Sequence, residues 1–121
     1  MKFKVAILGS TGSIGDNTLD IIRKDKKNFE VVLLTANKNY KKLIKQAIEF
    51  KVKNILIYDD KYYKYLKKKI KNKKINFFSR KTKLNKILKK KIDYCICGIS
   101  GLDGLEPTLD IIKFTRAVAI A

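Results

Sequence analysis

The residues best suited to bind a ligand lie near the amino terminus, in the run Gly9-Ser10-Thr11-Gly12-Ser13-Ile14-Gly15. An apolar segment precedes the run and an amphipathic segment follows it, which is the order strand, glycine turn, helix. Glycines let the backbone turn tightly and approach a pyrophosphate, and the first N–H groups of the helix attract the anion. The run therefore predicts a dinucleotide-binding turn. The spacing of its glycines is G-x-x-G-x-x-G, because Ser10 occupies the place of the first glycine in the usual G-x-G-x-x-G motif. The alternative interpretation is a glycine-rich turn that binds no ligand.

A second polar segment, Asn37-Lys38-Asn39, follows the next apolar run. In an NAD site a carboxylate about 20 residues past the glycine turn accepts hydrogen bonds from the ribose 2′-hydroxyl. This chain has no Asp or Glu there, and Lys38 offers a cation to a 2′-phosphate. The segment therefore predicts NADP(H) as the cofactor, unless Lys38 is only one more lysine in a lysine-rich chain. Lys42, one helical turn further on, is expected to have little influence on the choice of cofactor.

No residue in the 121 positions is predicted to be catalytic or to bind a metal. The chain has no histidine, and its two cysteines, Cys95 and Cys97, are two residues apart in an apolar run, on one face of a strand. They are expected to be buried, reduced thiols. The carboxylates that follow or border apolar runs are interpreted as helix caps, strand-edge charges or loop residues; these are Asp59, Asp60, Asp93 and Asp103.

The elements that must position these residues alternate between apolar runs and amphipathic segments. Strands are expected at 3–8, 29–34, 55–58, 75–78, 92–97 and 116–121, with helices from 14, 40, 62, 84 and 107. The apolar stripes of three of these helices are predicted to be Ile14, Thr18, Ile21 and Ile22; Tyr40, Leu43, Ile44, Ala47 and Ile48; and Leu109, Ile111 and Ile112. Strict alternation predicts an α/β fold, a Rossmann-like doubly wound parallel sheet of about six strands. The loops after the first, second and fifth strands should converge on one crevice.

Composition limits the remaining possibilities. The length allows one domain, and an apolar fraction of 45% supports a core. The formal charge of +18 suggests a nucleic-acid partner or an anionic membrane surface. However, the excess is almost all lysine, and it accompanies many Ile, Asn, Tyr and Phe residues. All of these amino acids have A/T-rich codons, so a bias in the genome is the simpler cause of the charge. Most of the lysines fall at 67–74 and 89–91, without an interleaved aromatic platform. We therefore expect no nucleic-acid partner and, without a signal peptide or long apolar run, no membrane segment and a cytoplasmic location.

Three segments together resemble one enzyme family. They are Lys4–Leu19 with the glycine run, Leu34-Thr35-Ala36-Asn37-Lys38-Asn39, and Gly101-Leu102-Asp103-Gly104-Leu105-Glu106-Pro107-Thr108. The combination resembles the 1-deoxy-D-xylulose 5-phosphate reductoisomerases over the whole chain. The resemblance implies that Thr11, Gly12, Ser13 and Ile14 contact the NADPH pyrophosphate and neighbouring groups. It also implies that Asn37, Lys38 and Asn39 hold the 2′-phosphate end, with Asn37 standing where many relatives have glycine.

The resemblance further implies an activity that these residues cannot complete alone. The family converts 1-deoxy-D-xylulose 5-phosphate to 2-C-methyl-D-erythritol 4-phosphate with NADPH and Mg²⁺ or Mn²⁺, whose ligands lie in a later catalytic domain. Residues 1–121 are therefore expected to be an incomplete NADPH-binding domain, truncated before the catalytic and C-terminal domains and inactive alone. The full-length enzyme is expected to be a homodimer. The alternatives are another NADP-dependent oxidoreductase or epimerase, such as a semialdehyde dehydrogenase, and a basic nucleic-acid-binding module.

Overall fold

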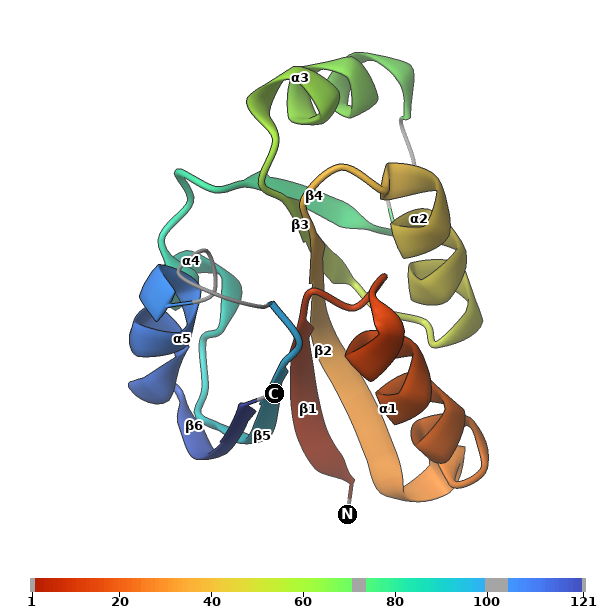
Figure 1. The fold of residues 1–121 in the computed structure, drawn as a ribbon, viewed down its shortest axis with the longest axis vertical. Coiled ribbons are helices and arrows are strands. Elements are labelled where there is room, and N and C mark those ends of the chain that lie inside the picture. Colours follow the sequence, from red (N-terminus) through yellow and green to blue (C-terminus); the bar gives the residue numbers. More distant parts are fainter. Residues whose placement is uncertain (1, 71–73, 100–104, 121) are drawn as a thin grey trace.

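The computed structural model describes residues 2–70, 74–99 and 105–120, which form one parallel sheet with helices on both faces (Figure 1). The strand order is β4-β3-β2-β1-β5-β6, and every neighbouring pair is parallel. The strands are β1 (Phe3–Leu8), β2 (Phe29–Ala36), β3 (Asn54–Ile57), β4 (Asn76–Ser79), β5 (Ile92–Cys97) and β6 (Thr115–Ile120). The predicted doubly wound sheet of six strands is confirmed.

The helices separate into two layers. They are α1 (Ser13–Arg23), α2 (Tyr40–Glu49), α3 (Asp60–Lys69), α4 (Leu84–Ile87) and α5 (Leu105–Ile112), with a short 3-10 turn η1 (Lys26–Asn28) before β2. The side chains of α1, α2 and α3 share a core with one face of the sheet, and those of α4 and α5 share a core with the other. In β1, Val5 and Ile7 belong to the first core while Ala6 and Leu8 belong to the second. A strand covered on both faces has no polar alternation, which explains the continuous apolar run.

The buried faces of the helices differ from the predicted stripes. In α1 the buried residues are Gly15, Leu19 and Ile22, whereas Ile21 is 67% exposed. Each helical residue is rotated by about 100° from the one before it, so an apolar neighbour of a buried position can still face solvent. Ile48 in α2 is likewise exposed. In α5 Ile111 is buried, and Leu109 and Ile112 are exposed.

The order of the strands reverses at β1. The chain runs outward from β1 through β2, β3 and β4, then crosses back to place β5 on the other side of β1. Crossover connections therefore leave the carboxyl ends of β1 and β5 in opposite directions, which opens a crevice between them. This is the place at which a doubly wound sheet binds its ligand.

Cys95 and Cys97 are both buried in the same core, as their spacing predicts, and both are free thiols. The Cys97 sulfur lies 2.9 Å from Thr108 Oγ1, at hydrogen-bond distance. Burial, with a smaller contribution from Cys97, raises the pKa of the Cys95 thiol from 9.0 to about 12. Cys95 therefore strongly favours its neutral form in the folded chain.

We expect this burial to make stability fall at alkaline pH. The folded pKa lies above the unfolded value, so the stabilisation is present below the unfolded pKa and is lost as pH rises towards 12. We measure the free energy of unfolding in urea at about pH 8 and about pH 10. The decrease between these two pH values should be smaller in Cys95→Ala than in the unaltered chain, by on the order of 1 kcal/mol. Lysine and tyrosine titration cancels in this difference. Equal losses in the two proteins would contradict the prediction.

Candidate cofactor site

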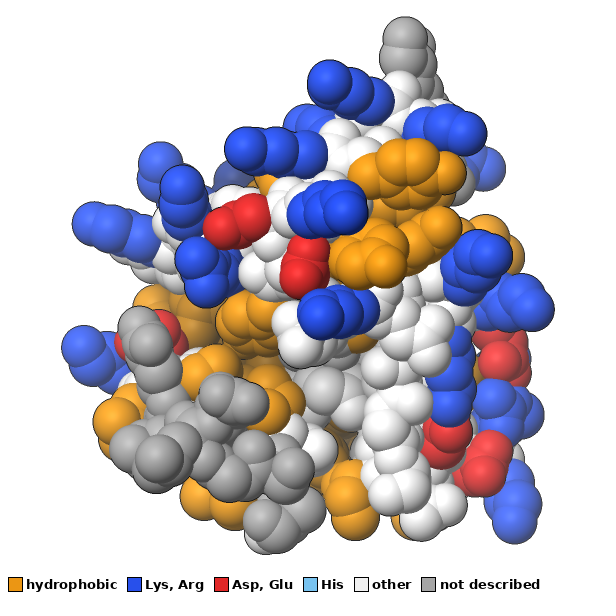
Figure 2. Space-filling view, turned by 45° about the horizontal axis from the view of Figure 1, so that its top comes forward, with side chains coloured by type: hydrophobic (Ala, Val, Ile, Leu, Met, Phe, Trp, Pro, Cys, Tyr) orange, Lys and Arg blue, Asp and Glu red, His pale blue; other side chains and the backbone are white. Residues whose placement is uncertain are grey.

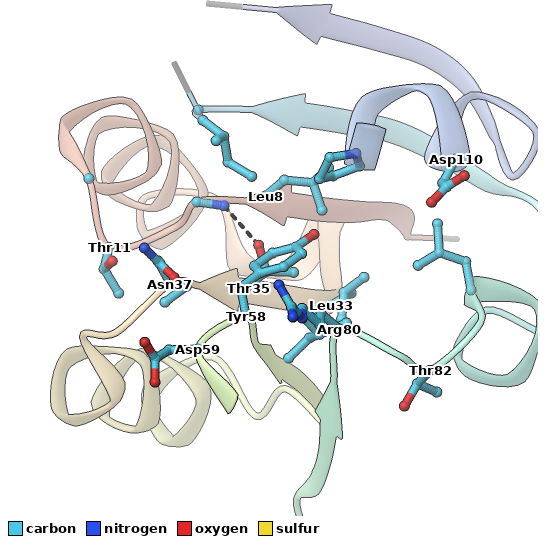
Figure 3. Close-up of a pocket in the computed structure, with 18 of the residues that line it drawn as sticks. Leu8, Thr11, Leu33, Thr35, Asn37, Tyr58, Asp59, Arg80, Thr82 and Asp110 are labelled. Carbon is cyan, nitrogen blue, oxygen red and sulfur yellow. Dashed lines mark hydrogen bonds between the residues drawn. The ribbon is translucent and has the colours of Figure 1, made fainter. Parts of the chain in front are cut away.

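A cavity of about 1210 Å³ lies at the carboxyl ends of the strands. Its walls come from the loops after β1, β2, β3, β4 and β5 and from the start of α5 (Figure 3). They include Gly9, Thr11, Gly12, Asn37, Tyr58, Asp59, Arg80, Thr82, Gly98, Ile99, Pro107 and Asp110. The predicted convergence of the loops after the first, second and fifth strands is confirmed. The loops after β3 and β4 also contribute, which the sequence pattern does not predict.

The three glycines of the turn meet different constraints. Gly9 has a φ of +72°, in the left-handed region that side chains disfavour. A Cβ atom on Gly15 would lie 2.3 Å from the backbone oxygen of Ser10, so α1 can start this close to β1 only with glycine there. Among the described residues, a Cβ atom on Gly12 would meet nothing nearer than the Gly9 oxygen at 3.7 Å. The space beside Gly12 is therefore open to a ligand.

Ser10 fixes the turn to the neighbouring elements. Its backbone N–H donates to the Thr35 carbonyl oxygen at 2.9 Å, and the N–H of Gly9 donates to Thr35 Oγ1, also at 2.9 Å. The buried hydroxyl of Ser10 donates to Gln46 Oε1 at 2.9 Å, and Gln46 Nε2 donates back to the Ser10 carbonyl oxygen at 3.0 Å. Serine in place of the usual glycine thus gains a buried polar partner on α2. Gln46 could not be predicted from the sequence, because its only signal is a polar residue among the apolar positions of a helix.

Helix α1 begins at the cavity wall, because its N-cap residue Gly12 lines the cavity. Glycine has no side chain to accept a hydrogen bond from the first turn. By contrast, Asn39 caps α2 by accepting from the N–H of Lys42, and Asp59 caps α3 by accepting from the N–H of Tyr62. The N-terminus of α1 therefore keeps its positive dipole end available to an anion, as a pyrophosphate site requires. The cap predicted at Asp59 is confirmed.

The structure brings some of the predicted site residues to the cavity. Thr11, Gly12 and Asn37 line it. Ser13 and Ile14 form the start of α1, while Lys38 and Asn39 are exposed before α2. These last four residues are not among the described residues of the cavity wall, and cofactor contacts by all seven predicted residues stay a prediction.

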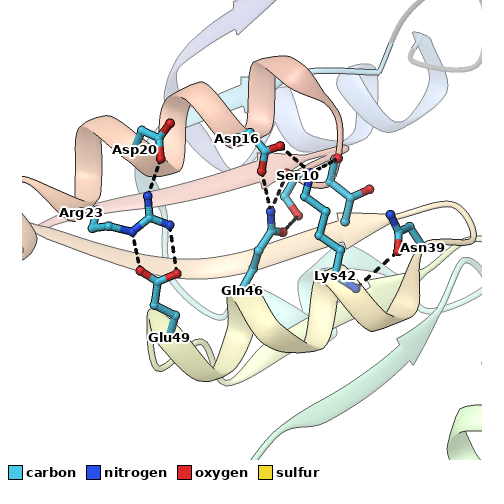
Figure 4. A network of polar contacts seen from close by, with 9 residues as sticks. Ser10, Asp16, Asp20, Arg23, Asn39, Lys42, Gln46 and Glu49 are labelled. Atoms are coloured by element: carbon cyan, nitrogen blue, oxygen red, sulfur yellow. Dashed lines mark hydrogen bonds and ion pairs between the residues drawn. The ribbon is translucent and has the colours of Figure 1, made fainter.

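Lys42 lies in a position that its sequence context does not predict. Its Nζ donates to the Thr11 carbonyl oxygen at 2.9 Å and pairs with Asp16 on α1 (Figure 4). A change at Lys42 would therefore disturb the glycine turn itself. The expectation that Lys42 has little influence on the choice between NADPH and NADH stays a prediction, and an exposed lysine makes a cleaner control for Lys38.

The other carboxylates fill structural roles where they are described. Asp60 pairs with Arg80 at 3.2 Å, and Asp93 accepts from the backbone N–H of Lys4 at 2.8 Å. Asp103, with the rest of 100–104, lies outside the described residues. Within 2–70, 74–99 and 105–120, no three potential metal-binding side chains lie together.

None of the helices in the described ranges is long and apolar enough to cross a membrane.

Three tyrosines on α2 and α3 lie together beside Lys69, one of the lysines of the 67–74 run. The ring of Tyr40 lies 5.6 Å from that of Tyr62 and 5.9 Å from that of Tyr65, between centroids. The ammonium of Lys69 lies 5.3 Å from the centroid of Tyr65. Figure 2 shows a hydrophobic patch with Lys and Arg side chains around it on this face. Nucleic-acid binding is therefore an alternative to test directly.

Together, the parallel sheet, the strand reversal at β1, the glycine turn and the uncapped α1 define a dinucleotide-binding domain of the Rossmann type. Comparison with known proteins identifies the family. The family model for 1-deoxy-D-xylulose 5-phosphate reductoisomerase matches residues 5–121, and the chain belongs to this family.

Individual relatives agree with the family model. The reductoisomerase of Pelagibacter ubique is 56% identical over 120 residues, which cover 98% of this chain and 31% of that protein. The Porphyromonas gingivalis reductoisomerase is 36% identical and is matched over 32% of its length by the whole chain. The chain thus spans about a third of the length of the curated relatives it matches.

Solved structures match the fold. The Zymomonas mobilis reductoisomerase in complex with NADPH superposes on the whole chain with a TM-score of 0.87 and 32% identity, over 32% of its own length. A DOX-P reductoisomerase in complex with magnesium gives a TM-score of 0.84 and 30% identity, again over the whole of this chain and 31% of that one.

Proposed function

We propose that residues 1–121 are the NADPH-binding domain of a 1-deoxy-D-xylulose 5-phosphate reductoisomerase. The observation that carries this proposal is the uncapped N-terminus of α1 beside the open space at Gly12, on the wall of the cavity. Family membership and the NADPH in the Zymomonas mobilis structure support it. The residues present fit a dinucleotide, because a pyrophosphate needs close backbone approach and unpaired N–H groups.

The proposed roles of the residues follow from their places in the fold. Thr11, Gly12, Ser13 and Ile14 hold the pyrophosphate through the turn and the start of α1. The segment from Asn37 to Asn39 holds the 2′-phosphate end, with Lys38 supplying the positive charge. When bound, NADPH supplies the hydride that reduces the substrate. The chain's own part is to bind and orient the cofactor.

The rest of the reaction belongs to residues outside this chain. The described residues offer no metal cluster, while a related reductoisomerase structure contains magnesium. We therefore place the Mg²⁺ or Mn²⁺ ligands and the pocket for the substrate phosphate in further domains of a longer protein. That protein converts 1-deoxy-D-xylulose 5-phosphate to 2-C-methyl-D-erythritol 4-phosphate on the route to isoprenoids. We propose that it acts in the cytoplasm as a homodimer, without a nucleic-acid partner.

Competing titrations test the cofactor assignment. The chain is titrated with NADPH, with NADH and with a nonspecific DNA duplex at physiological salt and at higher salt. We expect NADPH to bind more tightly than NADH and more tightly than the duplex. Lysine-driven duplex binding should fall steeply with salt, because it releases counterions. Duplex binding without any NADPH binding would favour the basic binding module instead.

We expect the chain alone to have no reductoisomerase activity, even with NADPH, Mg²⁺ and 1-deoxy-D-xylulose 5-phosphate in excess. The physical reason is that no metal cluster exists in the described residues to polarise the substrate oxygens. The measurement is substrate-dependent NADPH oxidation, followed by absorbance. Oxidation that disappears when the metal is removed would contradict this prediction.

A further inference from the structure

Lys42 on α2 joins the two segments that are expected to hold phosphate groups. Its Nζ donates to the Thr11 carbonyl oxygen at 2.9 Å and pairs with the carboxylate of Asp16 on α1. Its backbone N–H donates at 3.3 Å to the side chain of Asn39, which follows Lys38 directly. Figure 4 shows Lys42 and Gln46 extending from α2 towards the turn and the start of α1. One residue thus contacts the turn, the first helix and the loop after β2.

The contact with Thr11 fixes one peptide plane of the turn from both ends. Lys42 holds the Thr11 carbonyl oxygen, and the following N–H, that of Gly12, donates to the Gly9 carbonyl oxygen at 3.3 Å. The next residue, Ser13, begins α1. The orientation of this plane therefore sets where the first N–H groups of α1 point.

Gln46, one helical turn after Lys42, strengthens the same connection. Its Nε2 donates to the Ser10 carbonyl oxygen at 3.0 Å and to Asp16 Oδ1 at 3.3 Å. Asp16 thus accepts from both α2 side chains. With 38% of its side chain exposed, Lys42 is half-buried, and the Asp16 carboxylate offsets its charge. The ammonium is engaged by groups of the protein and is directed at the turn.

We propose that Lys42 is a positioning residue, which presets the glycine turn for the pyrophosphate and does not itself bind the 2′-phosphate. This inference rests on the proposed NADPH function. The expected effect of losing Lys42 differs from that of losing Lys38. NADPH and NADH share the pyrophosphate, so losing Lys42 should weaken the binding of both by the same factor. A residue that bound the 2′-phosphate would affect NADPH alone. A turn that is set before binding costs less to order on binding.

The test compares Lys42→Met, Lys42→Arg and Asp16→Asn with Lys45→Met, which removes an exposed charge from the same helix. Dissociation constants for NADPH and NADH are measured by calorimetry at fixed ionic strength. We expect Lys42→Met to weaken both cofactors about tenfold, since it removes a charge-assisted hydrogen bond. Asp16→Asn should weaken both to a smaller extent, Lys42→Arg should restore much of the affinity, and Lys45→Met should change neither. A loss confined to NADPH, or tighter NADPH binding in Asp16→Asn, would overturn the proposal.

A measurement without ligand separates this inference from the proposed function. Hydrogen–deuterium exchange should become faster at residues 9–16 in Lys42→Met, while exchange in β3 stays as in the unaltered chain. Lys45→Met should leave both regions unchanged. Uniformly faster exchange would show a general loss of stability and overturn the positioning role. If the unaltered chain binds neither cofactor, the proposed function fails, while the exchange pattern still decides whether Lys42 orders the turn.

Discussion

Gly15→Ala is expected to destabilise the chain by about 3 kcal/mol, a large part of the 5–15 kcal/mol that holds a typical domain folded. The added Cβ atom would lie 2.3 Å from the Ser10 backbone oxygen and 2.4 Å from its Cα atom. These are main-chain atoms, held in place by the bonds of Ser10 to Thr35 and Gln46. The overlap between the new Cβ atom and Ser10 can therefore be removed only if α1 moves away from β1. Urea unfolding followed by circular dichroism measures the loss.

Gly12→Ala is the matched control, because its Cβ atom has room. We expect its stability to stay within about 1 kcal/mol of the unaltered chain. Its NADPH affinity should nevertheless fall about tenfold or more, since the methyl group fills space that a pyrophosphate approaches. The two substitutions should thus separate folding from binding. Equal stability losses would show that Gly15 is not required for close packing. If Gly15→Ala yields no folded protein, that outcome agrees with the prediction provided that Gly12→Ala folds.

The fold could be predicted because its signals are local. Each strand is a short, mostly apolar run, and strands such as β1 and β2 are covered on both faces, while the edge strand β6 is largely exposed. Asp59 before α3 and the glycine run before α1 mark helix starts within a few residues. The buried faces were harder to predict: Ile14 and Ile21 are apolar, yet Gly15 and Leu19 face the sheet. Residue type does not reveal that a helix packed this closely needs its smallest residue against the strand.

The candidate site could be predicted from the sequence only where consecutive residues of one segment are enough to recognise it. The turn could be recognised from its glycines and its place after a strand. The contacts that hold it come from Thr35 on β2 and from α2, 25 to 36 residues later in the sequence. No spacing rule links Ser10 to Gln46 or Thr11 to Lys42, because those distances depend on how α1 and α2 pack. Arg80 was missed for the same reason, since it reaches the cavity only through the position of β4 beside β3.

Lys38→Asp is expected to weaken NADPH far more than NADH. Loss of a charge-assisted hydrogen bond to the 2′-phosphate costs about 1.5–3 kcal/mol, or roughly ten- to a hundredfold in affinity. Repulsion between the new carboxylate and the phosphate adds to this loss. NADH carries a hydroxyl at the same place, which a carboxylate can accept from, so its affinity should hold or rise. Dissociation constants for both cofactors at fixed ionic strength give the ratio.

The structure decides which lysine controls this experiment. Lys42 is a poorer control, because it binds Thr11 and Asp16, and its replacement should lower both affinities even though their ratio stays nearly constant. Lys41 is exposed in the first turn of α2, three residues from Lys38, so Lys41→Asp makes the same change of charge in nearly the same field. If Lys38 faces the 2′-phosphate, the ratio of NADPH to NADH affinity should fall for Lys38→Asp and stay nearly constant for Lys41→Asp. A ratio that moves equally for both would show that Lys38 contributes only to the diffuse positive charge of the chain, and the loop after β2 would then have no specific part in choosing the cofactor.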